Sequence, residues 1–209
     1  MPEAALLAAL RQMVPEGAGL GWADAALDHP LMPGESLPGA VPARLREFAA
    51  GRTAARMALA AIGAGSVALP KAADRTPVWP AGIIGSITHS GRHCLAVAML
   101  AGQFRGIGID LEEDGPLDSA LWDTILRPEE RGQMTGALAK RVFSAKEAAF
   151  KAQYPVSRSL FDFDVMRVDL QDTLFTAIFM QAVPPFASGD RIAGRTARVG
   201  GHVLTLAHV

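Results

Sequence analysis

Two short segments of the chain carry the residue types that could do chemistry. Residues 106–112 read Gly-Ile-Gly-Ile-Asp-Leu-Glu, and residues 143–151 read Phe-Ser-Ala-Lys-Glu-Ala-Ala-Phe-Lys. The first segment has two carboxylates, and the second has a carboxylate between two lysines. Carboxylate oxygens are the ligands that Mg²⁺ prefers, and lysines bind phosphate as point charges. Together the two segments indicate a divalent-metal site for a polyphosphate.

The first segment is typical of a strand. Side chains alternate along a strand, so Asp110 and Glu112 share one face with Gly106 and Gly108. The opposite face is apolar, and we expect it to be the core side. Glycine weakens a strand, and the close approach of a bulky ligand would explain two glycines beside the carboxylates. The alternative interpretation is the solvated polar face of an edge strand.

The second segment is typical of the start of a helix. Ser144 and Glu147 form a capping-box pattern, and Glu147 and Lys151 form an i,i+4 ion pair. Both features have purely structural explanations. In the functional interpretation, Glu147 binds a metal ion while Lys146 and Lys151 on either side of it bind phosphate.

The turn at residues 85–91 contains hydroxyl groups, a histidine and two glycines. Free backbone N–H groups and hydroxyls in such a turn suit a phosphate, and Arg75 and Arg92 lie nearby in the sequence. His89 could equally be a structural residue at a strand end. No third member of a catalytic triad accompanies it, so a Ser-His nucleophile is not indicated.

Composition limits the class of protein. The chain has 209 residues, of which 50% are hydrophobic and 20% charged, as is usual for one large or two small globular domains. A net charge of −1 provides no general attraction for nucleic acid or an anionic membrane. The lone Cys94 suits a reducing compartment. The N-terminal segment lacks the basic region of a signal peptide and is too short to span a bilayer. We expect a cytoplasmic protein without a transmembrane segment.

The elements predict an α+β fold of two similar halves, each a small antiparallel sheet packed with helices. Residues 1–102 form the first half and residues 103–209 the second. Within helix 42–62, Arg52 and Arg56 share a face because they lie four residues apart. Helices are predicted at residues 4–13, 42–62 and 128–152, an antiparallel meander at 83–90, 94–100 and 104–111, and further strands at 165–170, 174–180 and 203–207.

The motifs resemble those of a known family. Residues 106–112 and 143–151 are similar to the two signature motifs of the Sfp-type 4′-phosphopantetheinyl transferases, and residues 85–90 resemble the upstream motif. Residues 51–56 and 77–80 resemble the branch that contains enterobactin synthase component D. Several motifs in the right order are far more specific than any one alone. The resemblance covers roughly residues 44 to 152.

The resemblance implies a fold of two similar halves with the active site between them, and transfer of phosphopantetheine from coenzyme A to a serine of an acyl or peptidyl carrier protein. It implies that Asp110, Glu112 and Glu147 hold Mg²⁺, with Mn²⁺ as a possibility that oxygen ligands leave open. Glu147 is then the first candidate for the general base and Glu112 the second, and Lys151 contacts the phosphates and the leaving 3′,5′-ADP.

The resemblance also implies the contacts to coenzyme A. Thr88 and His89 lie at the 3′-phosphate, and Arg52 and Arg75 contact the adenosine-side phosphates. Where the family often has Gly-Lys-Pro, this chain has Arg-Thr-Pro at residues 75–77, with the basic residue one position earlier. The first half would therefore face the adenosine and the second half would carry the metal and the catalytic groups.

The partners expected are coenzyme A and an apo carrier protein, and the chain is expected to be a monomer. The branch favours a siderophore or other nonribosomal peptide system. Carrier proteins of the family tend to be acidic, so a groove with basic neighbours at residues 121–140 is a candidate docking surface, although its apolar residues could equally be core. A Mg²⁺-dependent hydrolase of nucleotides or pyrophosphates, and a non-catalytic module that binds coenzyme A or a carrier, are the two alternative functions.

Overall fold

The computed structural model describes residues 2–209, and their contacts divide them into two compact units, Glu3–Gln103 and Phe104–Val209 together with Pro2. The fold is α+β, with two antiparallel sheets. The helices are α1 (Pro2–Met13), α2 (Pro42–Ala61), α3 (Trp122–Ile125) and α4 (Gly136–Ser157), and the 3₁₀ turns are η1 (Ser119–Leu121), η2 (Pro128–Glu130) and η3 (Phe163–Val165). The strands are β1 (Gly19–Asp24), β2 (Ile83–Ser90), β3 (His93–Leu100), β4 (Ile107–Glu113), β5 (Met166–Gln171), β6 (Leu174–Phe179), β7 (Arg191–Val199) and β8 (His202–His208).

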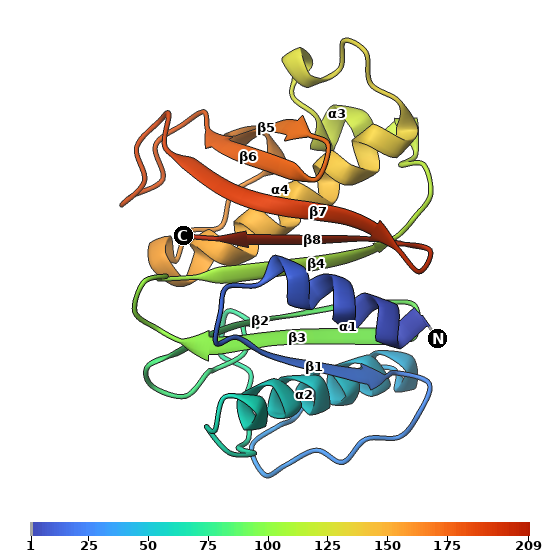
Figure 1. The fold of residues 1–209 in the computed structure, drawn as a ribbon, viewed down its shortest axis with the longest axis vertical. Coiled ribbons are helices and arrows are strands. Elements are labelled where there is room, and N and C mark those ends of the chain that lie inside the picture. The colour runs from blue at the N-terminus through green and yellow to red at the C-terminus, as the bar shows by residue number, and fades with distance from the viewer. Residues whose placement is uncertain (1) are drawn as a thin grey trace. The chain divides into compact units, whose positions relative to one another are not determined.

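The first unit is a three-stranded sheet, in the order β1-β3-β2, packed against α2 (Figure 1). Helix α2 begins at Pro42, whose missing N–H costs nothing at a first helical position, and Gly63 follows its end in the left-handed region with φ 77°. Strand β1 pairs antiparallel with β3, and Gly21 lies opposite Ala96. The sequence did not predict β1, because the glycines that open it lower strand propensity.

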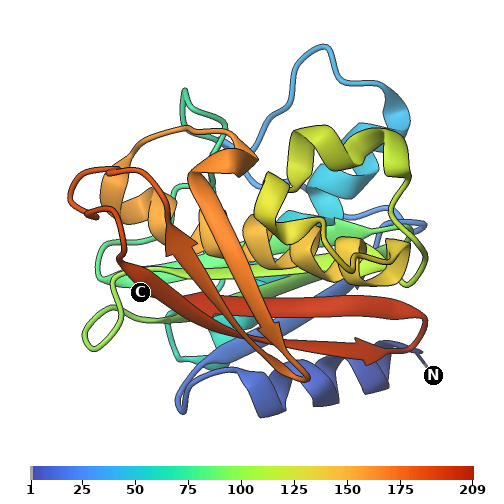
Figure 2. The same ribbon diagram turned by 90° about the horizontal axis from the view of Figure 1, so that it is seen from above.

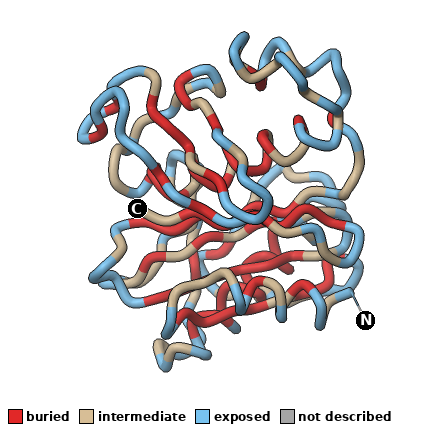
Figure 3. The backbone as a smooth tube through the Cα atoms, turned by 45° about the horizontal axis from the view of Figure 1, so that its top comes forward, coloured by how far each residue is buried: buried red, intermediate tan, exposed pale blue. Residues whose placement is uncertain are grey.

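Two glycines let α2 pack directly on β1. A Cβ on Gly21 would lie 1.9 Å from the Ala54 carbonyl oxygen, and one on Gly19 would lie 2.1 Å from that of Ala58. Real Cβ atoms do not approach so closely, so only glycine fits under the two helical alanines. The buried alanines of this layer form the core of the unit with Leu59 and Leu69. Figure 3 shows buried segments of the chain in red.

The second unit is a five-stranded sheet in the order β4-β8-β7-β6-β5, and α4 lies along one of its faces (Figure 2). The predicted meander is confirmed for β2 and β3, which pair antiparallel, but is wrong for the third strand, because β4 pairs with β8 in the other sheet. The sequence did not predict β7. Its inward side chains include a glycine and a threonine rather than an apolar series, so the period-two hydrophobic signal is weak.

The glycines of residues 106–112 have the same role as those of β1. A Cβ on Gly108 would lie 2.0 Å from the Ala148 carbonyl oxygen, and one on Gly106 would lie 2.0 Å from that of Ala152. Helix α4 fills the space that we attributed to a bulky ligand, so that explanation of the glycines is wrong. Strand β4 is at the edge of its sheet, as the alternative interpretation expected, but a helix covers its carboxylate face at one end, so that face is not simply solvated: Asp110 is only 4% exposed.

Helix α4 begins well before the segment predicted as its start. Thr135 caps it, its side chain accepting a hydrogen bond from the Leu138 backbone N–H at 3.3 Å, and Arg158 ends it in the left-handed region. Ser144 consequently lies inside the helix with no exposed surface, and the predicted capping box is wrong. Among residues 2–209, no helix has the length and hydropathy that a bilayer span requires.

Candidate active site

The structure brings the two sequence motifs of the second unit together at Asp110. Its Oδ1 atom accepts a hydrogen bond from Lys151 Nζ at 2.7 Å, and its Oδ2 atom accepts one from Ser144 Oγ at 2.8 Å. Strand β4 supplies the carboxylate, and one face of α4 supplies both donors. A buried carboxylate requires such charge-assisted partners, which also fix the plane of the carboxyl group.

Glu112 and Glu147 complete a group of three carboxylates. Glu112 Oε2 accepts a hydrogen bond from Lys140 Nζ at 3.0 Å. Burial raises the pKa of Glu147; the Lys151 ammonium opposes that rise, and the negative charges of Asp110 and Glu112 add to it. The pKa of Glu147 therefore responds to the other two carboxylates, as expected for acidic groups that share one site.

These carboxylates suit a hard cation by their chemistry. Among residues 2–209 no three His, Cys, Asp or Glu side chains are already arranged around one metal position. Asp110, Glu112 and Glu147 nevertheless offer the oxygen ligands that Mg²⁺ takes, and their mutual repulsion at a partly buried position is what a divalent cation relieves. The lysines that now pair with two of them are the groups that a phosphate would engage.

Lys146 is placed differently from Lys151. It is only 2% exposed, and its ammonium donates to the Ile125 carbonyl at 2.8 Å, to Glu130 Oε2 at 2.7 Å and to the Phe163 carbonyl at 3.1 Å. An ammonium has three N–H donors, so all of them are used within the protein. Burial lowers the pKa of Lys146, and the hydrogen bond and charge of Glu130 oppose that fall. A contact between Lys146 and coenzyme A, which remains a prediction, would require one of these bonds to break.

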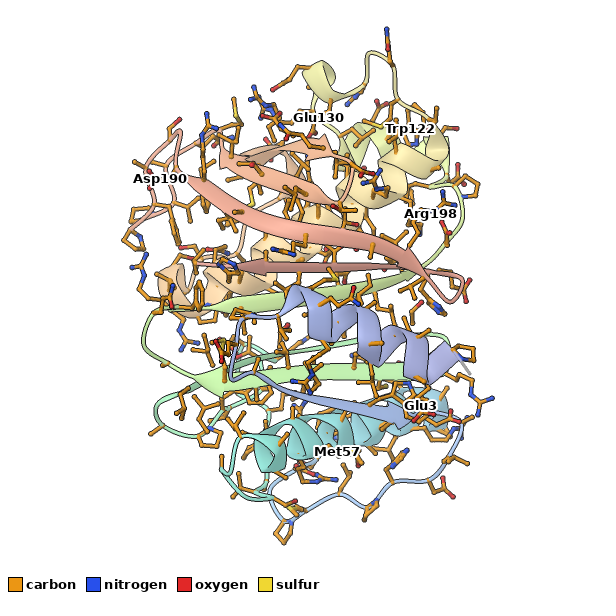
Figure 4. All side chains as sticks on the ribbon, in the orientation of Figure 1. Glu3, Met57, Trp122, Glu130, Asp190 and Arg198 are labelled. Atoms are coloured by element: carbon orange, nitrogen blue, oxygen red, sulfur yellow. The ribbon has the colours of Figure 1, made fainter. Side chains whose placement is uncertain are left out.

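Glu130 makes this buried ion pair a junction of several elements. Its Oε1 atom accepts from the Val168 backbone N–H at 2.7 Å, and its Oε2 atom accepts from the Arg127 backbone N–H at 2.8 Å as well as from Lys146 (Figure 4). The pair thus ties α4 to η2 and to β5. Its location indicates a structural role for Lys146, which the sequence could not distinguish from phosphate binding.

In the first unit, a basic cluster lies where β2 meets the start of α2. Arg44 Nη1 is 2.8 Å from His89 Nε2 and donates to Glu47 Oε2 at 2.9 Å. His89 is exposed, as a ligand-binding residue would be, and Arg44 is exposed as well. Arg44 was not predicted from the sequence. Its position eight residues before Arg52, in the first turn of the helix, is the signal that could have found it.

A cavity of about 510 Å³ adjoins this cluster in the first unit. Arg46 and Arg92 are its cationic lining residues. Arg92 donates to both carboxylate oxygens of Asp24, and this hydrogen bonding lowers the pKa of Asp24. The lining residues are Ala25, Ala26, Asp28, Ala43, Arg46, Glu47, Gly91 and Arg92.

The other three residues predicted to contact coenzyme A lie outside this cluster. Thr88 is buried on the face of β2 opposite His89, because successive strand residues point to opposite sides. Arg75 is exposed in a turn, with φ 72°. Arg52 is 5% exposed and donates through Nε to the Leu69 carbonyl at 2.7 Å, and burial lowers its pKa to about 10.

The segment at residues 121–140, predicted as a carrier surface, divides into two kinds of residue. Ile125 and Leu126 are buried in the core of the second unit, and Trp122 packs against that core. Leu121 and Leu138 are exposed. The core interpretation therefore holds for part of the segment, and only the exposed residues remain available to a partner.

Known proteins resemble this chain over both units. Residues 33–99 match the family model described as the N-terminal domain of 4′-phosphopantetheinyl transferase, and residues 106–206 match that of the 4′-phosphopantetheinyl transferase superfamily. The chain is 37% identical to the 4′-phosphopantetheinyl transferase Svp of Streptomyces mobaraensis over 79% of its own length and 72% of the relative's.

Two further relatives match different shares of this chain. The chain is 29% identical to the 4′-phosphopantetheinyl transferase PptT of Mycobacterium tuberculosis over 74% of this chain and 70% of that protein. It is 42% identical to enterobactin synthase component D of Escherichia coli over 52% of this chain and 54% of that protein. The resemblance found in the sequence motifs is confirmed: the chain is an enzyme of the 4′-phosphopantetheinyl transferase superfamily.

Proposed function

We propose that this chain transfers 4′-phosphopantetheine from coenzyme A to a serine of an apo acyl or peptidyl carrier protein and releases 3′,5′-ADP. The observation that carries the proposal is the ion pair of Asp110 with Lys151, beside Glu147, in a chain of this superfamily. This ion pair brings a carboxylate that can bind a metal ion next to the Lys151 ammonium, which can bind a phosphate. The chain spans 72% and 70% of the length of two relatives that are named as this transferase.

In the proposed reaction, the carrier serine oxygen forms a bond to the β-phosphorus of coenzyme A. The bond from that phosphorus to the bridging pyrophosphate oxygen breaks, and the electron pair leaves with 3′,5′-ADP. Glu147 is the first candidate to take the serine proton. Glu112, already held by Lys140 at 3.0 Å, is the second. Lys151 would bind the pyrophosphate and stabilise the charge on the leaving group.

Asp110, Glu112 and Glu147 would hold Mg²⁺, or Mn²⁺, which takes the same ligands. When bound, the cation supplies positive charge that offsets the charge of the pyrophosphate. The chain's own contribution is to fix Asp110, through Ser144 and Lys151, before the cation arrives.

The first half, residues 1–102, would contact the adenosine side of coenzyme A. Arg44 and His89 are the exposed basic residues for the 3′-phosphate, and Arg46 and Arg92 line the adjoining cavity. Arg75 remains a candidate for the same role. Thr88, Arg52 and Lys146 are weaker candidates, because each is buried and the last two already donate to carbonyl groups of the chain.

We also propose that the two halves, 1–102 and 103–209, arose from one β-α-β-β arrangement. The sheet order β1-β3-β2 with α2 corresponds to β4-β8-β7 with α4, and the glycines of β1 and β4 lie under alanines of α2 and α4. The active site between the halves, a monomeric state, a cytoplasmic location and a carrier from a siderophore or other nonribosomal system remain predictions.

Intact-mass spectrometry of an apo peptidyl carrier protein, incubated with the chain, coenzyme A and Mg²⁺, tests the proposal. A carrier heavier by one phosphopantetheine, and not modified when its serine is replaced by alanine, would support it. Loss of modification on adding EDTA would support the metal. An acyl carrier protein is the second substrate to try. Release of 3′,5′-ADP without any carrier would instead indicate a hydrolase, and binding of coenzyme A without turnover would indicate a non-catalytic module.

A further inference from the structure

A row of buried hydroxyl groups leads to Asp110 across the sheet of the second unit. Asp110 of β4 lies directly opposite Thr205 of β8, and Thr205 lies directly opposite Thr196 of β7. Cross-strand neighbours of this kind point to the same face of a sheet. Helix α4 places Ser144 against the same face. The sheet register thus aligns two threonine hydroxyl groups with Asp110, and α4 adds a third hydroxyl group.

The hydroxyl groups are hydrogen-bonded to one another in that order. Ser144 Oγ lies 2.8 Å from Asp110 Oδ2 and 2.9 Å from Thr205 Oγ1, and Thr205 Oγ1 lies 3.3 Å from Thr196 Oγ1. Ser144 and Thr205 have no exposed surface, and Thr196 is 2% exposed.

The direction of these bonds follows from proton counting. A carboxylate only accepts, so Ser144 uses its single proton on Asp110. Thr205 must then donate to Ser144, and Thr196 must donate to Thr205. Every hydroxyl dipole in the row is therefore oriented toward Asp110, and bonds aligned in this way strengthen one another.

Packing alone does not account for three hydroxyl groups in this place. Valine would fill the two threonine positions on a buried strand face and would have no polar atom to satisfy. Ser144 lies in a helix interior, where alanine is preferred. What the hydroxyl groups add is a fixed orientation for the Asp110 carboxyl group.

We propose that Ser144, Thr205 and Thr196 are positioning residues that set the affinity of the candidate metal site by holding the Asp110 carboxylate. The proposal rests on the metal assignment made above. Groups that orient a metal ligand in this way typically contribute about 10- to 100-fold to metal affinity. The effect should decline along the row, because only Ser144 touches the carboxylate.

Binding of Mn²⁺ to the full chain with coenzyme A and no carrier, followed by electron paramagnetic resonance, tests this without turnover. Ser144→Ala should weaken Mn²⁺ affinity about 10-fold or more, Thr205→Val by less and Thr196→Val by least. The Mg²⁺ concentration for half-maximal transfer should shift in the same order, and kcat at saturating Mg²⁺ should recover. Thr176→Val on β6, a partly exposed threonine outside the row, is the control and should leave both unchanged.

Three results would overturn the inference. Wild-type affinity for Mn²⁺ in Ser144→Ala is one, and an equal loss in the Thr176→Val control, tracking thermal stability rather than the row, is another. The third is a wild-type chain that modifies the carrier but does not bind Mn²⁺. In that case the transfer stands and the positioning role fails, so failure of this inference is distinguishable from failure of the proposed function.

Discussion

Strands β1 and β4 pack against their helices in the same way, with glycines under helical alanines. They differ in the residues that follow these glycines. In β1, Gly19 and Gly21 lie under Ala58 and Ala54 of α2. Gly106, directly before β4, and Gly108 within it lie under Ala152 and Ala148 of α4. Two glycines two residues apart and two alanines four residues apart on one helix bring backbone against backbone in both places. The glycines of the motif at residues 106–112 are therefore packing residues.

The difference begins two residues after the second glycine. On the same face as the glycines, β1 continues with Ala23 and β4 continues with Asp110. Ala23 lies opposite Cys94, and Asp110 lies opposite Thr205. The first pair is part of an apolar core, and the second belongs to a polar row.

The helices differ in the same way. Met57 of α2, labelled in Figure 4, has its Cβ atom 2.9 Å from where a Cβ on Gly21 would lie, and Lys151 of α4 has its Cβ atom 2.9 Å from where a Cβ on Gly108 would lie. One residue before each aligned alanine, α2 has Thr53 and α4 has Glu147. The scaffold is common to both units, and the carboxylate chemistry is confined to the second, so matched substitutions in the two units separate packing from catalysis.

Glu147→Gln, with Thr53→Val as its counterpart, should give the largest difference. Loss of a general base lowers kcat by typically 10²- to 10⁴-fold, so we expect about 10³-fold for Glu147→Gln at unchanged thermal stability. Thr53→Val removes only an acceptor for Arg56, and its turnover should remain near wild type. Steady-state transfer to a carrier protein measures both. Near-wild-type turnover in Glu147→Gln would remove it from the chemistry.

Lys146→Met tests whether the buried cations at corresponding positions of the two helices, Lys146 and Arg52, are structural. Removing one partner of a buried ion pair typically costs about 3–5 kcal/mol, because Glu130 is left unpaired. Urea unfolding measures that loss. The KM for coenzyme A should remain unchanged in the folded fraction, since all three Lys146 donors bind the chain.

Arg52→Met, at the corresponding position of α2, is the companion variant. Arg52 donates to the Leu69 carbonyl and lies over the Phe48 ring at 4.3 Å. It should also lose stability, and by less than Lys146→Met, because it leaves a carbonyl rather than a carboxylate unsatisfied. A rise in KM for coenzyme A with stability intact, in either variant, would restore the phosphate contact implied by the sequence.

Gly108→Ala and Gly21→Ala test the packing device itself. A Cβ at either position would meet a helix carbonyl oxygen at about 2 Å, so the helix must move away from the strand. Overpacking of this kind costs about 1–3 kcal/mol, and we expect similar losses in urea unfolding for both variants. Only Gly108→Ala should also weaken Mn²⁺ binding, since it displaces the helix that holds Ser144 and Lys151. An equal loss of Mn²⁺ affinity in both variants would mean that α4 does not position the site.

The sequence predicted where the motif residues lie on their strand and helix, because the period of each element is a local property; their roles remain predictions. The period of β4 placed Asp110 and Glu112 on one face, and the structure joins Asp110 to Lys151 at 2.7 Å. The helix at residues 42–62 and the hairpin of β2 and β3 were likewise predicted from Pro42, Gly63 and alternating apolar residues.

The features that the sequence could not supply depend on distant contacts. Lys146 and Lys151 look alike in a linear motif, yet one ammonium faces Glu130 and two carbonyl groups while the other reaches Asp110. The capping pattern of Ser144 has the right spacing, but an earlier cap at Thr135 determines where the helix begins. Strand β7 was missed because its inward Thr196 serves the hydroxyl row rather than an apolar core.

The smallest predicted effect concerns Cys94. It lies opposite Ala23 in the first unit, as Thr205 lies opposite Asp110 in the second. Burial raises the pKa of the Cys94 thiol from 9.0 to about 12. Because the folded pKa exceeds the unfolded one, the thiol's contribution to stability is fully present below pH 9.0 and declines as the pH rises toward about 12.

At about pH 10 the wild type should have lost about 1.4 kcal/mol of unfolding free energy relative to Cys94→Ala, compared with their difference at about pH 7. Urea unfolding of both proteins at the two pH values measures this, and it cancels every group that titrates in both. Parallel curves would mean that the thiol ionises as readily in the folded core as in water, and that the apolar counterpart of the hydroxyl row is open to solvent.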